Sequence, residues 1–539
     1  MIPGRVRSAA CAAGLLAFLA SAGAAAGPGP AADGLLVLKD GRVFEGVPME
    51  RKDDALLLRF ANGEVRVPLT LVEDYIIAGA ALPEPATEEE REKRAKGLVP
   101  FRGRWVPAAE REKALRKEID DRRKSIEDHR KHSEWRDRYK FKTRNFEFES
   151  TQPPWLNEDY AELLETYFKE FGKIWKTKVP QKWGRLKVCF YGSRKDFQQI
   201  SGASGGVLAY YRFVEPRELN FYYDRADTEM SVDCLFHEAN HYLTALMDPG
   251  FRYPHWINEA MAEYYGASTW DPAKKTMAVG GVQQGRLVEV QRDIEDKKLL
   301  SIRDMVASNR GAYEHYYWGW SLVHFLMETP KYREKFMRFF ADLAQAPDVS
   351  RRPSGFPGLN EVKDGEECLR VFLSRLGIKE QGLDALQKEW HAHIEKLGSN
   401  AANQLRGYEE AGLRAFHEGR LAFRAPRLLK AAIDKGSTRG QVHVAYAQCL
   451  MQKSLAGAAP EGTDPESLKA EAMLAVQRAV ALAPLDAEVW AQWALLTYLG
   501  GNQPEGERML ALAREIDPES SFLDLELWVK IQAARKELE

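Results

Sequence analysis

The chain has 539 residues, enough for three or four domains of about 150 residues each. An apolar content of 45% can form real hydrophobic cores, and an aromatic content of 11% argues against wholesale disorder. The formal net charge of −2 provides no global attraction to nucleic acid or to an anionic membrane surface, so we expect no nucleic-acid partner.

Residues 1–26 have the order of a secretory signal peptide. Arg5 and Arg7 precede the apolar run "AACAAGLLAFLASAGAAAG", which ends in small residues and fits cleavage after Ala24 or Ala26. No later stretch reaches about 18 uninterrupted apolar residues. We therefore expect an exported protein, periplasmic, cell-surface or secreted, with no integral membrane segment after cleavage of the signal peptide.

Residues 34–80 are predicted to form a small β domain that resembles an SH3-like barrel. Two hairpin signals, Asp40-Gly41 and Asn62-Gly63, lie between alternating apolar runs. Both pairs favour the positive φ angles that tight two-residue turns require. The domain is expected to serve either as a rigid spacer or as a module that docks the protein to a wall or a partner.

Residues 84–144 are predicted to be a charged helical linker. Of residues 110–140, 21 are charged, with both signs mixed, and only Leu115, Ile119 and Ile126 form a thin apolar stripe. A mixed-charge helix of this kind is usually a solvated arm. The insert "GLVPFRGRWVP" interrupts the helical pattern before it.

Residues 145–398 have the pattern of a globular α+β domain. "NFEFES", "LKVCFYG" and "ELNFYY" read as strands, and "YAELLETYFKEFGKIW" has apolar residues at helical spacing. The stretch "GGVLAYYRF" is expected to form an edge strand or a loop. "LLSIRDMV" and "YYWGWSLVHFLM" are predicted helices that follow the central motif described below.

Residues 399–539 are predicted to be helical and partly repetitive. "RAVALAPLDAEVWAQWALL" and "LAREIDPESSFLDLELWVK" align at an offset of 34, which is the period of tetratricopeptide repeats. Stacked helix pairs form concave binding surfaces, so this region either binds a protein partner or supports the preceding domain as a capping bundle. The whole chain is thus expected to be multidomain, mainly α with an α+β domain.

Four cysteines remain after the signal peptide, and they follow no metal-binding or disulfide spacing. Cys189, Cys234, Cys368 and Cys449 lie far apart in the sequence. Because free cysteine is among the most buried residue types, we expect mostly buried thiols.

The central motif lies in "CLFHEANHYLTAL", where His237, Glu238 and His241 spell H-E-x-x-H. On an α-helix, residues four apart lie about 40° apart on one face, so the two imidazoles can converge on one ion. Glu238 lies about 100° from His237 and can reach a water on that ion. One helical turn thus supplies two metal ligands and one base.

A second predicted helix, "HWINEAMAEYYG", supplies Glu259, 18 positions after His241. A catalytic zinc site uses three protein ligands and keeps one position open. His237, His241 and Glu259 fit this requirement for one zinc ion per chain. Glu263, one turn after Glu259, is placed to accept a hydrogen bond from a ligand imidazole and to fix its orientation.

Three other arrangements compete with this site. Cys234, one turn before His237, would make a closed structural zinc site if it were a fourth ligand. His255 could replace Glu259 as the third ligand. The motif could also hold no metal at all.

H-E-x-x-H followed by N-E-A-x-x-E resembles the gluzincin metallopeptidases. More narrowly, residues 145–395 are similar to the peptidase-MA-like domains of exported bacterial proteins, which often carry helical repeats. The resemblance implies zinc ligands at His237, His241 and Glu259, a general base at Glu238 and a supporting carboxylate at Glu263. It also implies a downstream Tyr or His that stabilises the oxyanion. "AYEHYYWGWSLVHFL" offers Tyr313, His315, Tyr316 and Tyr317, of which similar domains favour Tyr316.

The sequence lacks the G-x-M-E-N segment that holds the free amine of the substrate in the related aminopeptidases, which favours an endopeptidase. We therefore predict an exported zinc endopeptidase that acts on peptides or proteins. One alternative is a non-catalytic zinc-binding scaffold that binds partners through its barrel and repeats. Another is a zinc hydrolase that acts on a wall component. The intact Glu238 favours an enzyme, because a scaffold needs no base.

Overall fold

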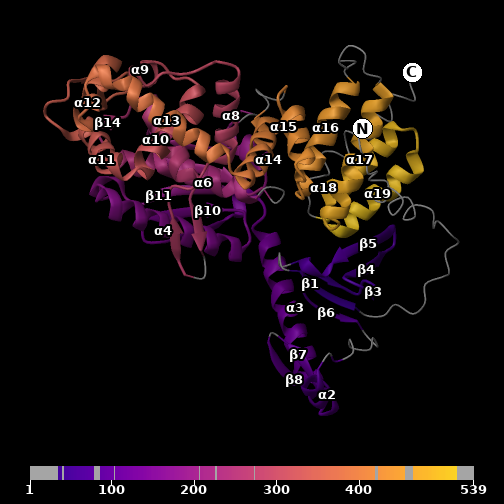
Figure 1. Ribbon diagram of the computed structural model, residues 1–539. Coiled ribbons are helices and arrows are strands. Elements are labelled where there is room, and N and C mark those ends of the chain that lie inside the picture. The colour runs from indigo at the N-terminus through magenta and orange to yellow at the C-terminus, as the bar shows by residue number, and fades with distance from the viewer. Residues whose placement is uncertain are drawn as a thin grey trace, which may run out of the picture. The chain divides into compact units, whose positions relative to one another are not determined.

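The structure is a computed structural model that describes residues 34–38, 42–77, 85, 87–101, 103–204, 207–224, 228–271, 274–418, 423–455 and 465–518 (Figure 1). The chain forms two compact units, Met1–Arg94 and Ala95–Glu539. The predicted signal peptide, the Asp40-Gly41 turn and most of the last predicted repeat lie outside the described residues. The described protein is mainly helical with small sheets, as the sequence predicts.

The first unit contains two three-stranded antiparallel sheets with strand orders β2-β1-β6 and β3-β4-β5. The strands are β1 Gly34–Leu38, β2 Val43–Glu45, β3 Met49–Lys52, β4 Ala55–Phe60, β5 Gly63–Pro68 and β6 Val72–Ile77. Alternate residues along them, such as Leu56, Leu58, Val65 and Val67, are buried. This period-two burial is what a half-buried sheet produces.

The predicted turn at Asn62-Gly63 is wrong by one residue. Phe60 pairs with Gly63, so the two-residue loop is Ala61-Asn62. This register places Arg59 opposite Glu64, at 3.1 Å, whereas the predicted turn would place Arg59 opposite Arg66. Opposite charges across an antiparallel pair stabilise a register that like charges disfavour.

The charged segment contains more regular structure than a single solvated helix. It comprises α2 (Glu88–Ala95), a hairpin of β7 (Leu98–Phe101) and β8 (Arg104–Pro107), and the long helix α3 (Ala108–Lys131). The insert predicted to interrupt the helix is therefore a β-hairpin, and α3 starts directly after it. Leu115 and Ile119 of the predicted apolar stripe are buried.

A five-stranded sheet lies at the centre of the second unit, in the order β12-β13-β11-β10-β9. The inner strands β10 (Phe146–Ser150), β11 (Leu186–Tyr191) and β13 (Glu218–Tyr222) are parallel, and the edge strands β9 (Tyr139–Lys142) and β12 (Ala209–Arg212) are antiparallel to them. Val188 and Phe190 of β11 face the main core, whereas Cys189 and Tyr191 face a smaller cluster around Phe197.

The first three helices of this part pack against the sheet, and the later ones pack mainly on other helices. In chain order the helices are α4 Pro154–Trp175, α5 Arg194–Ser201, α6 Thr228–Ala245, α7 His255–Gly266, α8 Gln284–Glu295, α9 Ile302–Val306, α10 Glu314–Glu328, α11 Pro330–Gln345, α12 Gly365–Leu376 and α13 Leu383–Gly398. Short strands complete the unit: β14 Phe251–Arg252, β15 Thr269–Asp271, β16 Thr276–Ala278, β17 Arg351–Pro353 and β18 Asn360–Val362. Four fully buried tryptophans, Trp256, Trp318, Trp320 and Trp390, fill the core between the helices.

The C-terminal region consists of helices that pack as successive neighbours. They are α14 Ala401–Glu418, α15 Ala425–Asp434, α16 Gly440–Leu455, α17 Pro465–Leu482, α18 Ala487–Leu499 and α19 Gln503–Ile516. Helix α8 belongs to both parts, because Leu287 and Val290 lie in the main core while Val288 packs with the C-terminal helices. The region is thus packed directly onto the preceding domain.

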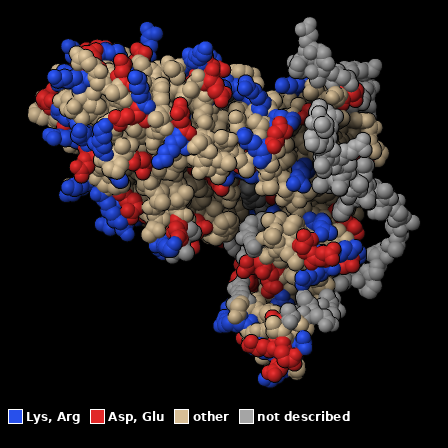
Figure 2. Space-filling view, in the orientation of Figure 1, with Lys and Arg blue, Asp and Glu red and all other residues tan. Residues whose placement is uncertain are grey.

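Within the described residues, no helix is long and apolar enough to cross a membrane. The described cysteines are free thiols, and Cys189, Cys368 and Cys449 are buried, as the sequence predicts. On the face in Figure 2, acidic and basic side chains are interspersed over the described surface, which agrees with the small net charge.

Candidate metal centre

Two packed helices supply the side chains of the site. His237 and His241 lie one turn apart on α6, and Glu259 and Glu263 lie one turn apart on α7. A buried hydrogen bond from Asn240 Nδ2 to the Tyr167 hydroxyl, at 2.8 Å, fixes α6 against α4. Because α6 and α7 are packed against each other, Glu259 lies beside both imidazoles and Glu263 lies beside that of His237.

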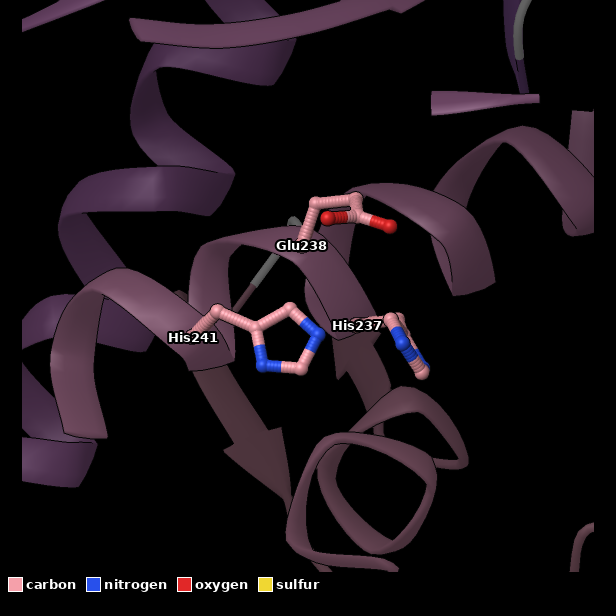
Figure 3. Close-up of side chains that lie close together, drawn as sticks. All are labelled: His237, Glu238 and His241. Atoms are coloured by element: carbon pink, nitrogen blue, oxygen red, sulfur yellow. The ribbon is translucent and has the colours of Figure 1, made fainter. Parts of the chain in front are cut away.

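Three potential donor atoms form a triangle with Glu259 Oε2 at one corner. Glu259 Oε2 lies 3.3 Å from His237 Nε2 and 3.6 Å from His241 Nε2. Figure 3 shows the two imidazoles on the same side of α6, with Glu238 beside them. The imidazole rings have centroids 5.0 Å apart and are nearly perpendicular, at 85°.

These distances fit a metal ion. Ligand atoms that bind zinc tetrahedrally at about 2.0–2.1 Å are separated from one another by about 3.3–3.4 Å. Glu259 Oε2 and His241 Nδ1 are also buried with no hydrogen-bond partner in the structure. A buried carboxylate oxygen without a partner is costly, and a cation between the three donors would remove that cost. The side chains therefore fit zinc.

Glu238 lies close to the same donors but has a different environment. Its carboxylate belongs to the group of potential ligand atoms, with His237 and His241, that lie within 4.8 Å of one another. Its Oε2 accepts a hydrogen bond of 2.8 Å from the Tyr211 backbone N–H, on the edge strand β12. We assign Glu259 rather than Glu238 as the third ligand, because Glu259 Oε2 has no other partner and faces both Nε2 atoms.

Glu263 lies behind His237. Its Oε1 is 3.5 Å from His237 Nδ1, and Arg286 donates to both of its oxygens, at 2.6 and 3.0 Å. The side chains of Glu263 and Arg286 are only 2% and 3% exposed. Arg286 also donates to Glu289 Oε2 at 3.1 Å, so a second buried carboxylate balances its charge.

The electrostatics differ among the three glutamates. Burial raises the pKa of Glu238 despite the opposing effect of the imidazoles. Burial would also raise the pKa values of Glu259 and Glu263, but nearby positive charges dominate. The histidines hold the pKa of Glu259 at about 2, and Arg286 with Arg414 holds that of Glu263 at about 2. Glu259 and Glu263 are thus anions, while Glu238 is the more basic carboxylate.

The aromatic segment brings one of its four candidates to the site. The ring of Tyr316 stacks on His237 at a centroid distance of 5.9 Å and an angle of 7°. Burial, together with the charge of Glu259, raises its pKa, so its hydroxyl keeps its proton at neutral pH. The hydroxyls of Tyr313 and Tyr317 donate instead to Glu289 and Asp293, and His315 contacts His255.

The two alternative ligands lie elsewhere. Cys234 packs against the main core. His255 Nε2 approaches the other oxygen of Glu259, at 3.9 Å, and its Nδ1 lies 3.0 Å from His315 Nδ1. The predicted ligands, base and supporting carboxylate are therefore brought together, and Cys234 and His255 stay outside the triangle.

Two members of the site were missed in the sequence. Arg286 lies 23 positions after Glu263 on another helix, and Tyr211 contributes only its backbone N–H. Arg286, Glu289 and Asp293 are charged yet buried at helical spacing in α8. The available signal was that these three charged residues recur on one helical face among apolar neighbours. Such a pattern indicates paired charges, because charged residues are almost never fully buried unless they are paired.

Comparison with known protein families gives one match. Residues 231–350 match a family described as "Protein of unknown function (DUF1570)". The matched segment begins within α6 and ends after α11, so it contains the metal-ligand candidates and Tyr316. No curated protein matches the chain.

Proposed function

We propose that the protein is an exported zinc-dependent metallopeptidase that hydrolyses internal peptide bonds. The observation that carries the proposal is the triangle of His237 Nε2, His241 Nε2 and Glu259 Oε2, with separations of 3.3 and 3.6 Å to the carboxylate oxygen. Three ligands with one open position are typical of catalytic zinc, whereas structural zinc sites are closed by a fourth protein ligand.

Zinc in this site would supply Lewis acidity that makes water acidic and polarises a carbonyl group. Glu238 is placed to take a proton from the attacking water and to pass it to the leaving amine. Its raised pKa suits both steps, because a base with a pKa nearer to neutral both accepts and releases a proton. The Tyr211 N–H holds one carboxylate oxygen and leaves the other for the proton.

Tyr316 is the proposed donor to the oxyanion. Its ring lies against His237, and its raised pKa keeps the hydroxyl protonated, as a hydrogen-bond donor must be. Among the described strands, edge strand β12 pairs only with β13, and it lies beside α6. An extended polypeptide could add to its free side, which favours a peptide substrate.

The small β unit and the C-terminal helices are accessory modules in this proposal, an SH3-like barrel and tetratricopeptide-like repeats that bind a partner or anchor the enzyme. The leader-like residues 1–26 are the basis for proposing export.

The test compares the purified protein with the Glu238→Gln variant. Zinc content is measured by elemental analysis, and cleavage is measured with casein and a peptide library. Glutamine can still accept the Tyr211 N–H, so we expect about one zinc per chain in both proteins. Loss of a general base lowers the rate by about 10²–10⁴-fold. Equal cleavage by both proteins would refute the role of Glu238. Zinc binding without cleavage of any substrate would favour the non-catalytic scaffold.

A further inference from the structure

The environment of Glu263 shows that the metal centre is supported from outside α6 and α7. Arg286 donates to both oxygens of Glu263, and the nearer oxygen, Oε1, lies 3.5 Å from His237 Nδ1. A planar guanidinium that grips a carboxylate with two hydrogen bonds fixes its orientation as well as its charge. The direction in which Glu263 faces His237 is therefore set by Arg286.

Arg286 is itself held on three sides. Its Nη1 donates to Glu289 Oε2 at 3.1 Å and to the Tyr313 hydroxyl at 3.0 Å, and the guanidinium carbon lies 5.4 Å from the ring centroid of Tyr316. Tyr313 and Tyr316 belong to the start of α10, so Arg286 joins α7, α8 and α10. These contacts leave the Arg286 side chain little freedom to adopt another orientation.

The position of α8 is set by α14, the first helix of the C-terminal region. The backbone N–H of Gly285, next to Arg286, donates to Glu410 Oε2 of α14 at 3.0 Å. The two helices approach so closely that a β-carbon on Gly407 would lie 2.5 Å from the Gln284 carbonyl oxygen. Backbone contact of this kind leaves α8 no room to move closer to α14.

Further contacts tie α14 to the helix that carries the histidines. Arg406 forms an ion pair with Glu229 in the first turn of α6 and another with Glu410, the latter at 2.7 Å. Helix α14 thus contacts α6 and α8 at once.

We propose that Arg286 is a positioning residue for the metal centre, and that α14 holds it in place, so that the C-terminal helical region contributes to the metal affinity of the site. The inference rests on the proposed zinc site. It extends that proposal, because it makes the C-terminal region part of the support of the metal centre and not only a surface for partners.

The test measures zinc affinity by competition with a chromophoric chelator, together with the visible absorption of the Co²⁺-substituted protein. The variants are Arg286→Lys, Arg286→Met and Glu410→Ala on α14. Lysine keeps the charge of Arg286 but cannot donate the paired hydrogen bonds to both oxygens of Glu263. The control is Asp434→Ala, which removes a carboxylate that pairs with Lys430 on α15. Circular dichroism identifies the variants that are folded.

Loss of the direct partner of a metal ligand typically weakens metal binding by about 10–100-fold. Arg286 acts through that partner, Glu263, so we expect a loss of about tenfold in Arg286→Met, a similar or smaller loss in Arg286→Lys, and a loss of several-fold in Glu410→Ala. The Co²⁺ absorption should change in both Arg286 variants and stay unchanged in Asp434→Ala. An Arg286 variant that does not fold is set aside, and the other variants decide.

Three negative results have different meanings. If the unaltered protein binds no zinc, the proposed function itself fails. If it binds zinc, but the folded variants keep its affinity and Co²⁺ spectrum, the inference is overturned and the proposed function stands. Loss of affinity in the Arg286 variants alone, with Glu410→Ala unchanged, would overturn the part assigned to α14.

Discussion

The buried pair of Glu263 and Arg286 gives the sharpest prediction of stability. In Glu263→Gln, the volume of the side chain is kept but its charge is lost, and Arg286 keeps a charge that is only 3% exposed. Removing one partner of a buried ion pair costs about 3–5 kcal/mol. We expect the lower end, about 3 kcal/mol, because Glu289 still pairs with Arg286 at 3.1 Å.

The assay is the thermal unfolding of metal-free protein in chelator, followed by calorimetry. For a domain of roughly 150–250 residues, 3 kcal/mol corresponds to a fall of about 6–12 °C in Tm. Glu366→Gln is the control, because Glu366 is 74% exposed and pairs with Arg303 at 3.4 Å. An exposed pair is worth about 0–1 kcal/mol.

A double variant separates stability from metal binding. Glu263→Gln combined with Arg286→Met removes both charges and should recover part of the lost stability, since no unpaired charge stays buried. Its zinc affinity should stay low, because His237 still lacks its carboxylate partner. A Tm for Glu263→Gln no lower than that of Glu366→Gln would refute this account of the pair.

Two further predictions concern chemistry at the site. Tyr316→Phe should keep the zinc content and lower kcat by about 10²–10³-fold, because one donor to the oxyanion is removed. An unchanged kcat in a peptide-cleavage assay would exclude Tyr316 from this role. Burial alone would lower the pKa of His237, but contact with Glu259 and the charges of Glu263 and Glu238 raise it above its usual value. Because zinc binds neutral imidazole, protons compete below that raised pKa, so affinity should fall by up to about tenfold for each pH unit under it. Zinc titrations at pH 6, 7 and 8 check this, and equal affinity at pH 6 and 8 would contradict it.

Local periodicity accounts for much of the site. The spacing of His237 and His241 places them on one face of a helix, and the spacing of Glu259 and Glu263 does the same on the next. Such i and i+4 relations are fixed by the backbone and need no knowledge of tertiary structure. Apolar patterns also predicted the inner strands β10, β11 and β13 of the five-stranded sheet and helices such as α4 and α10. Edge strand β9 was not predicted, because it lies in the segment assigned to the charged helical linker.

Features that depend on distant partners were not predictable. Arg286 meets Glu263 only because α8 packs near α7, and no spacing rule connects the two positions. Two local features were missed as well. The turn at Ala61-Asn62 lies one residue before the Asn-Gly signal, in the register that pairs Arg59 with Glu64. "GLVPFRGRWVP" was expected only to interrupt a helix, and its hairpin depends on pairing between its own two halves.

The close seam between Gly407 and α8 bears on where this protein can be divided. Residue 398 marks the end of the predicted α+β domain, but a truncation there would remove α14 and leave Gly285 and Val288 facing water. Recombinant fragments should therefore extend at least through α14. The α+β domain and this helix would then be inherited as one unit.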